Sequence, residues 1–253
     1  MANIEVKGLT KIYNKKIVLD DLNFTVKDGE FLSILGPSGC GKTTLLKILI
    51  GIEKCDTGSI HKGTRNITNV DPAKRGMGMV FQNYALFPNM TVLENVMYAL
   101  KLKLKNKNKA RERSLEMLKL VNMEEHINKY PHQLSGGQQQ RVAIVRTLAL
   151  KPDIILFDEP MSALDADNRL GLRKTIKELQ KQFNTTMIYI THDQEEAFSM
   201  SDRVMVMKDG KIEQIDTPNK IYNHPANTYV KNFVTKHLRD KVSSIEKCTG
   251  IDL

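Results

Sequence analysis

The sequence contains no tryptophan and only three cysteines, Cys40, Cys55 and Cys248, among its 253 residues. Because the cysteines are few, odd in number and widely spaced, we expect neither a disulfide framework nor a zinc site and interpret them as reduced thiols. No stretch approaches the ~20 consecutive apolar residues that a membrane-spanning helix needs. The N-terminal segment alternates like a strand and lacks the apolar core of a signal peptide, so we expect a protein that is made and kept in the cytoplasm.

A balance of opposite charges is also lacking. The formal charge is +9 and the isoelectric point is near 9.3, an excess that can serve nucleic acid, anionic lipid or solubility. Much of it lies in residues 101–113, a run that is most simply a solvated surface. No aromatic side chains interleave with this run, so we expect no nucleic-acid partner. Proximity to a membrane explains the run about as well.

What is present is the composition of a folded protein, with 41% hydrophobic and 26% charged residues. Apolar or alternating runs predict strands at residues 4–9, 17–26, 31–35, 59–61, 77–81, 154–157, 186–190, 203–207 and 211–214. The first three are expected to pair in sequence, with a turn at Asp28-Gly29. Helical spacing predicts helices after residue 41, within 91–123, at 135–150, at 168–183 and after 193.

Apolar strands that alternate with helices indicate an α/β fold with a mixed, mainly parallel sheet and helices on both faces. The paired strands at the beginning add an N-terminal antiparallel β part. The helical stretch at about residues 91–150 interrupts this alternation, so we expect it to form an inserted helical subdomain.

A glycine run joins the strand at residues 31–35 to the helix that follows it. Residues 36–43 fit the pattern G-x-x-x-x-G-K-[ST]. Such glycines let successive backbone N–H groups turn toward phosphate oxygens, and the helix N-terminus adds its positive end. Lys42 supplies a charge for the β and γ phosphates, and the Thr43 hydroxyl can ligate Mg²⁺. A turn that merely needs glycines is the alternative, but the flanking strand and helix favour phosphate binding.

Two carboxylates, Asp158 and Glu159, follow the buried-type strand at residues 154–157. A strand that ends in an acid delivers its carboxylate to the sheet edge, where ligands bind in open α/β folds. We expect Asp158 to hold Mg²⁺, directly or through water. Glu159 points elsewhere and is expected to orient and deprotonate the attacking water, a role that typically contributes ~10²–10⁴ in rate. Two such acids alone usually mark a surface turn. Because a phosphate loop is also present in this sequence, we favour a role for both acids in catalysis.

The run at residues 134–138 reads LSGGQ and opens a predicted helix. Ser135 and Gln138 fit a capping box, which explains a helix start. Two glycines in the first turn, Gly136 and Gly137, each cost a helix on the order of 1 kcal/mol. Because glycine has no side chain, they also leave the N–H groups of the helix N-terminus open to an anion. One nucleotide cannot easily use both this surface and the phosphate loop, whereas two chains can.

With these motifs in this order, the chain resembles the nucleotide-binding subunits of ABC transporters, which are P-loop NTPases. The resemblance covers about residues 4–234 and rests on the phosphate loop, Gln82, residues 134–138, Asp158-Glu159, residues 162–165 and His192. It implies an ABC ATPase domain at residues 1–234 and a short tail at 235–253. In that family two subunits pair head to tail around two ATP molecules. The resemblance therefore implies a homodimer with ATP and Mg²⁺ as cofactors.

The resemblance also implies roles for individual residues. Three of them, Glu159, His192 and Gln82, would aim the attacking water or contact the γ-phosphate, which implies an active ATPase. The implied metal ligands are Thr43, Gln82 and Asp158. The implied nucleotide contacts are Tyr13, Gly36, Pro37, Ser38, Gly39, Cys40, Gly41, Lys42, Thr43, Thr44, Ser135, Gly136, Gly137, Gln138 and Asp165. Tyr13 would stack on adenine, although a tyrosine between strands more often serves packing.

Residues 80–88, 191–197, 214–218 and 221–225 resemble bacterial importer ATPases for sugars, polyamines, ferric iron, phosphonates, sulfate or quaternary amines. This implies separate integral membrane permease subunits docked at residues 83–95, an indirectly coupled solute-binding protein, and a peripheral place on the cytoplasmic side of the cell membrane. Many such ATPases carry a β-rich regulatory domain after the position of Val234. About twenty residues follow it here, so either this member lacks that domain or the chain has been cut.

A non-transport ABC ATPase is the alternative function. DNA-repair members insert long heptad arms before the LSGGQ run, and the interval here is short. Translation-type members carry two cassettes, and one is present. A GTPase would offer an N-K-x-D element, which the sequence does not contain. The transported solute cannot be read from the chain, because it contacts other subunits.

Overall fold

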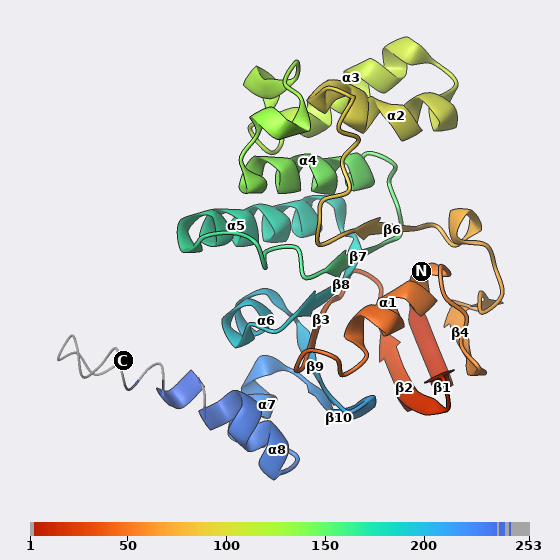
Figure 1. Ribbon diagram of the computed structural model, residues 1–253, viewed down its shortest axis with the longest axis vertical. Coiled ribbons are helices and arrows are strands. Elements are labelled where there is room, and N and C mark those ends of the chain that lie inside the picture. The colour runs from red at the N-terminus through yellow and green to blue at the C-terminus, as the bar shows by residue number, and fades with distance from the viewer. Residues whose placement is uncertain (1–2, 237, 241–242, 244–253) are drawn as a thin grey trace.

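The computed structural model describes residues 3–236, 238–240 and 243, and arranges them as two sheets with helices around them (Figure 1). Most of the tail expected at residues 235–253, including Cys248, lies outside the described residues. Across the described part, no helix combines the length and the apolar character that crossing a bilayer requires.

A six-stranded sheet forms the centre of the fold, in the order β10-β9-β3-β8-β7-β6. Its strands are β3 (Phe31–Leu35), β6 (Met77–Val80), β7 (Ile154–Asp158), β8 (Thr186–Thr191), β9 (Arg203–Lys208) and β10 (Lys211–Asp216). Every neighbouring pair is parallel except β9 with β10. The predicted mixed, mainly parallel sheet is therefore confirmed.

Successive residues of the central strands serve two different cores, since side chains alternate across a strand. In β7, Ile155 and Phe157 join the core that contains helices α4 (Gly136–Leu148) and α5 (Ala166–Phe183). Ile154 and Leu156 join the core around α1 (Lys42–Ile50) on the opposite face. Burial on both faces explains why this strand reads as an unbroken apolar run.

A four-stranded antiparallel sheet, ordered β2-β1-β4-β5, covers the α1 side (Figure 1). Its strands are β1 (Ile4–Tyr13), β2 (Lys16–Val26), β4 (Thr57–Lys62) and β5 (Arg65–Asn66). The helix α1 contacts β2 as well as β6 and β7, so it lies between the two sheets. The expected antiparallel N-terminal part is confirmed.

The expected pairing of the second and third strands is wrong. The turn is present, with Gly29 at φ +72°, but β3 joins the central sheet between β9 and β8. All five residues of β3 are buried, whereas exposed and buried positions alternate along much of β2. A strand that is apolar throughout needs cover on both faces, which only the central sheet provides.

The helices α2 (Val92–Leu104) and α3 (Lys107–Lys119) form an antiparallel hairpin that packs on α4 (Figure 1). Thr91 and Glu94 form a capping box at the start of α2, and Asn106 caps α3. Short 3₁₀ turns connect the elements here and after β5: η1 (Pro72–Lys74), η2 (Glu124–His126) and η3 (Pro131–Gln133).

Short helical elements that sequence periodicity does not reveal follow the central sheet. After α6 (Gln194–Met200) and the β9–β10 hairpin come α7 (Pro218–Asn223), α8 (Thr228–Val230) and the π-helical turn η4 (Lys231–Lys236). Ile221, Val230 and Val234 share a small core with β9. The available signal was local: Thr217 caps α7 and Pro218 occupies its first turn, which is a typical helix start.

Candidate functional site

The phosphate loop lies where predicted, between β3 and α1. Gly41 forms the N-cap of α1 at φ +101°, a conformation that glycine adopts without strain. Lys42 is buried, and its Nζ donates hydrogen bonds to the carbonyls of Gly36 (2.8 Å) and Pro37 (2.9 Å). The lysine thus links the start of the loop to the start of α1, and these bonds hold its ammonium beside the loop.

Neighbouring strands hold this loop tightly. A Cβ at Gly36 would lie 2.6 Å from the carbonyl oxygen of Met207 in β9, and one at Gly41 would lie 2.8 Å from that of Val18 in β2. The loop backs onto both sheets and leaves an open hollow of about 200 Å³ toward solvent. The residues that line this hollow are Val18, Ser38, Gly39, Gly41, Lys42, Thr43, Thr44 and Glu159.

Asp158 ends β7 beside the first turn of α1. The hydroxyl of Thr43 donates to its Oδ1 at 3.0 Å, although the two residues are 115 positions apart in the sequence. Burial raises the pKa of the Asp158 carboxyl, while the bond from Thr43 lowers it. A hydroxyl and a carboxylate that converge on one point are hard oxygen ligands of the kind Mg²⁺ prefers.

A magnesium ion fits this pair of ligands. Among the described residues no cluster of three or more His, Cys, Asp or Glu side chains could hold a metal. Mg²⁺ is commonly bound through one or two protein oxygens with water and substrate phosphates as the other ligands. The donor set of Thr43 and Asp158 is consistent with that mode of binding.

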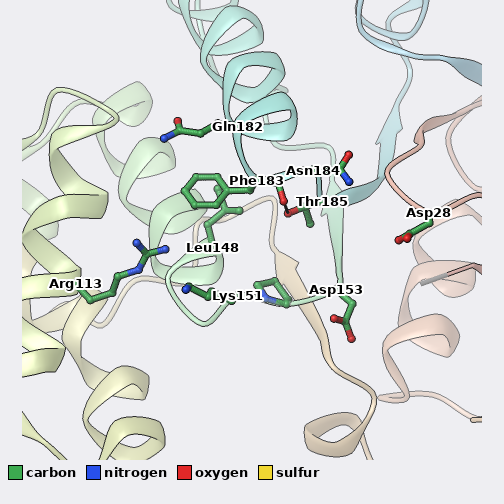
Figure 2. Close-up of a pocket in the computed structure, with 10 residues that line it drawn as sticks. Asp28, Arg113, Leu148, Lys151, Asp153, Gln182, Phe183, Asn184 and Thr185 are labelled. Atoms are coloured by element: carbon green, nitrogen blue, oxygen red, sulfur yellow. Dashed lines mark hydrogen bonds between the residues drawn. The ribbon is translucent and has the colours of Figure 1, made fainter. Parts of the chain in front are cut away.

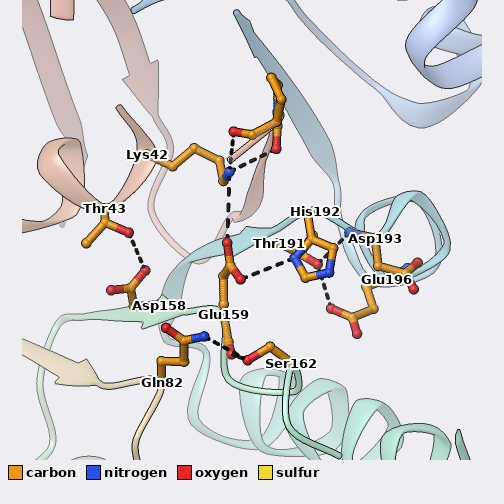
Figure 3. Close-up of polar contacts among 12 residues, drawn as sticks. Lys42, Thr43, Gln82, Asp158, Glu159, Ser162, Thr191, His192, Asp193 and Glu196 are labelled. Carbon is orange, nitrogen blue, oxygen red and sulfur yellow. Dashed lines mark hydrogen bonds and ion pairs between the residues drawn. The ribbon is translucent and has the colours of Figure 1, made fainter. Parts of the chain in front are cut away.

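Glu159 has a left-handed backbone, with φ +43°, and its carboxylate has other partners than that of Asp158. Such a conformation is uncommon for a residue with a side chain and is often found at functional sites. Its Oε1 lies 3.9 Å from Nζ of Lys42, and its Oε2 lies 3.2 Å from Nδ1 of His192 (Figure 3). The carboxylate therefore lies between the phosphate-loop lysine and the histidine that follows β8.

Gln82 reaches the same cluster through a serine. Its Nε2 donates to Oγ of Ser162 at 3.1 Å, and that hydroxyl donates to the backbone carbonyl of Glu159 at 3.0 Å (Figure 3). The structure thus brings together Lys42, Thr43, Gln82, Asp158, Glu159 and His192, six of the predicted site residues.

A buried carboxylate that sequence reasoning missed supports the histidine segment. Glu196 in α6 is 4% exposed, and its Oε2 accepts hydrogen bonds from the hydroxyls of Thr191 (2.8 Å) and Tyr189 (2.9 Å). Burial, followed by the charge of Glu196, raises the pKa of the Tyr189 phenol, which therefore stays a donor. The signal in the sequence was a tyrosine in an otherwise apolar strand, which needs a buried partner for its hydroxyl.

The LSGGQ run forms the start of α4, as its capping pattern predicts. Oγ of Ser135 accepts from the amide of Gln138 (3.3 Å), and Oε1 of Gln138 accepts from the amide of Ser135 (3.0 Å). Gly136 and Gly137 follow as the first two helical residues. None of the hydrogen bonds of Ser135 or Gln138 involves the Lys42–Glu159 cluster, and α4 and α1 lie apart in Figure 1. Within one chain, the start of α4 is therefore separate from the Lys42–Glu159 cluster.

Two further predicted residues lie outside the cluster. Tyr13 ends β1, is 40% exposed, and has the ammonium of Lys11 4.8 Å above its ring. Asp165 is the N-cap of α5, where its side chain accepts from the amide of Asn168 at 2.9 Å. Hydrogen bonds from Asn168 lower the pKa of the Asp165 carboxyl.

A wider hollow of about 560 Å³ lies elsewhere, between α3, the α4–β7 connection and the end of α5 (Figure 2). Arg113, Lys151 and Phe183 are among its lining residues, and none of the predicted site residues is. The candidate site is therefore chosen by its converging polar groups and not by volume.

Known proteins similar to this chain include two import ATP-binding proteins. The Fe(3+) ions import ATP-binding protein FbpC of Fusobacterium nucleatum is 46% identical over 235 residues, which cover 93% of this chain and 63% of that protein. The spermidine/putrescine import ATP-binding protein PotA of Marinobacter nauticus is 48% identical over 231 residues, which cover 91% of this chain and 62% of that protein. The chain therefore spans less than two thirds of the length of these curated relatives.

A solved structure, the dimeric post-hydrolysis state of the ATP-binding cassette MJ0796 bound to ADP and Pi, matches with a TM-score of 0.77 and 36% identity. The match covers 85% of this chain and 98% of that one. The family profile described as ABC transporter matches residues 19–162, more than half of the chain. This chain therefore belongs to the ABC transporter family and has the fold of its nucleotide-binding cassette.

Proposed function

We propose that this chain is the ATP-hydrolysing subunit that powers solute import through an ABC transporter. The observation that carries the proposal is the position of the Glu159 carboxylate, between Lys42 of the phosphate loop and His192. A carboxylate at this point can take a proton from a water molecule that attacks the γ-phosphate, while the lysine and the loop amides balance charge. The names of the two relatives, both import ATP-binding proteins, support the direction of transport.

In this proposal, different residues of the chain bind the phosphates, hold Mg²⁺ and activate water. The backbone N–H groups of the loop at residues 38–41 and the ammonium of Lys42 hold the phosphates. Thr43 and Asp158, with Gln82, hold Mg²⁺, which would neutralise charge on the phosphate oxygens. Glu159 orients and deprotonates the water, and His192 contacts the γ-phosphate.

Two such chains are proposed to close around two ATP molecules. The N-terminus of α4, with Ser135, Gly136, Gly137 and Gln138, is a second anion surface that the same chain does not bring to its own phosphate loop. A second copy, placed head to tail, would bring this surface to the γ-phosphate, and Asp165 would lie at the interface. The dimeric forms of the MJ0796 cassette support this arrangement. Tyr13, exposed at the end of β1, is the proposed adenine contact.

The permease is proposed to dock beside the start of α2. The rings of Phe87 and Tyr98 pack against each other with centroids 4.9 Å apart, and both are partly exposed. An exposed aromatic pair of this kind suits a protein contact. The protein would then act at the cytoplasmic face of the membrane, with a solute-binding protein coupled only through the permease. The named solutes of the two relatives differ, so the solute is not assigned.

The test compares ATP hydrolysis by the wild-type protein with that of Glu159→Gln, each also analysed by size-exclusion chromatography in Mg²⁺ and ATP. We expect the variant to lose hydrolysis by ~10²–10⁴ and to elute as an ATP-dependent dimer. Glu178→Gln, at an exposed position of α5, is the matched control and should behave as wild type. A Glu159→Gln protein that binds ATP and stays monomeric would remove the main support for the closed dimer.

A further inference from the structure

The end of α2, the turn after it and the start of α3 hold most of the chain's excess charge. Residues 101–113 contain seven lysines and arginines and one glutamate, so they carry +6 of the formal +9. Residues 101–109 are all exposed. Their five lysines form no ion pair within the described part of the chain: Lys101, Lys103, Lys105, Lys107 and Lys109. No carboxylate of the described residues therefore neutralises these lysines through an ion pair.

Exposed leucines alternate with these lysines. Leu102 is 70% exposed and Leu104 is 40% exposed. Leu104 also lines a hollow of about 460 Å³ together with Leu100 and Leu150. Lysines line this hollow too, as do the carboxylates Glu112 and Glu116. A surface that served only solubility would not need leucines among its lysines, whereas a basic surface with apolar side chains is typical of segments that lie at a membrane interface.

The orientation of α2 places this surface on the side proposed to face the membrane. Tyr98 and Leu102 are four residues apart and therefore lie on one face of the helix. Tyr98 packs on Phe87 in the proposed permease contact. The exposed Leu102 thus points to the same side as that contact, one helical turn further along. This step rests on the proposed function.

We propose that the basic turn of residues 101–109 binds the anionic lipid surface beside the permease. The lysines contact headgroup phosphates, and Leu102 enters the apolar boundary beneath them. Lysine suits this task, because it is a flexible point charge that needs no fixed geometry in its partner. Each lysine near an anionic membrane strengthens binding by roughly fivefold, and the attraction is screened by salt. No aromatic platform for stacking bases interrupts the run, which favours lipid over nucleic acid.

The test is sedimentation of the full chain with vesicles that contain no permease. We expect binding to vesicles of phosphatidylglycerol and phosphatidylcholine, little binding to pure phosphatidylcholine, and release at high salt. Replacing Lys101, Lys105 and Lys107 by Gln should weaken binding on the order of 100-fold. The matched control replaces the exposed Lys27, Lys181 and Lys231 by Gln, which removes the same charge and should have little effect.

A separate Leu102→Ser variant keeps the charge and should weaken binding by about fivefold. Three outcomes would each overturn the lipid proposal. The protein could bind neutral and anionic vesicles equally, or the control variant could lose as much binding as the test variant. A stoichiometric single-stranded oligonucleotide could also displace the protein from the vesicles. ATP hydrolysis measured on the same samples separates the two proposals. If the wild-type protein hydrolyses ATP but does not bind vesicles, only the lipid contact is rejected. If it binds vesicles but does not hydrolyse ATP, only the proposed ATPase activity is rejected.

Discussion

The carboxylate oxygen Oε2 of Glu159 lies 3.2 Å from Nδ1 of His192, which links the ends of β7 and β8. A carboxylate oxygen accepts hydrogen bonds, so this contact is a hydrogen bond when the imidazole donates from Nδ1. The residue proposed to activate water is thereby connected to the residue proposed to contact the γ-phosphate. A change in either side chain should affect the placement of the other.

Removing the imidazole should affect catalysis more than nucleotide binding. The His192 side chain is exposed, and among the described residues its polar partner is Glu159 rather than the phosphate loop. His192→Ala should therefore leave the Kd for ATP within a few-fold of wild type. Loss of one charge-stabilising donor should lower kcat about 10²–10³-fold. Steady-state hydrolysis and equilibrium nucleotide binding measure the two effects. His224→Ala, at an exposed position after α7, is the control, and unchanged kcat in His192→Ala would exclude the proposed role.

Glu196 should stabilise both the fold and the histidine segment. Glu196→Leu leaves the buried hydroxyls of Tyr189 and Thr191 without their acceptor, which should lower the free energy of unfolding by about 2–4 kcal/mol. Adding Tyr189→Phe should recover part of this loss, because removing both partners of a buried bond costs less than removing one. Urea unfolding of the two single variants and the double variant completes the cycle. Fully additive losses would show that the bond itself contributes nothing.

The sequence predicts the site well where each functional residue follows a recognisable element. Asp158 and Glu159 follow an apolar strand, and Lys42 follows a glycine run that opens a helix, so their elements and approximate positions could be expected. The hydrogen-bond partners of these side chains could not be predicted from the sequence. Thr43 bonds Asp158, 115 positions away, and Glu159 has a left-handed backbone; no local pattern encodes either feature.

The fold was predicted less completely where one strand could pair with either of two neighbouring strands. An Asp-Gly turn followed by an apolar strand fits a hairpin as well as a crossover to another sheet. Only packing on both faces decides between them, and that packing comes from distant helices such as α1 and α5. Single structural residues such as Arg75 gave no signal at all, because their partners are backbone carbonyls.

Arg75 should prove essential to the far end of the phosphate-loop helix. Its buried guanidinium donates to four backbone carbonyls, those of Ile48 (2.9 Å), Leu49 (2.8 Å), Val70 (2.7 Å) and Thr68 (2.9 Å). Lysine has fewer donors and no planar fork, so Arg75→Lys should lower the free energy of unfolding by about 2 kcal/mol and Arg75→Met by about 3 kcal/mol or more. Arg65→Lys, at an exposed position of β5, should change it by less than about 0.5 kcal/mol. Urea unfolding distinguishes these values, and an Arg75→Lys protein as stable as wild type would contradict the prediction.

Gly171 should be a position where the protein gains stability. It lies inside α5 on the exposed side, and a Cβ there would approach only Nη2 of Arg141, at an ordinary 3.6 Å. Alanine loses less backbone entropy than glycine on folding, so Gly171→Ala should raise the free energy of unfolding by about 0.5–1 kcal/mol. For a chain of this size that corresponds to roughly 1–4 °C in Tm.

The matched contrast to Gly171→Ala is Gly51→Ala at the end of α1. Gly51 has φ +90°, and its Cβ would lie 2.6 Å from Nε of Arg75. The substitution therefore adds backbone strain of about 1 kcal/mol or more and disturbs the carbonyl contacts of that guanidinium, so Tm should fall. Calorimetry of both variants tests the explanation directly. If both substitutions shift Tm in the same direction, helix propensity or local strain is not what decides stability at these two glycines.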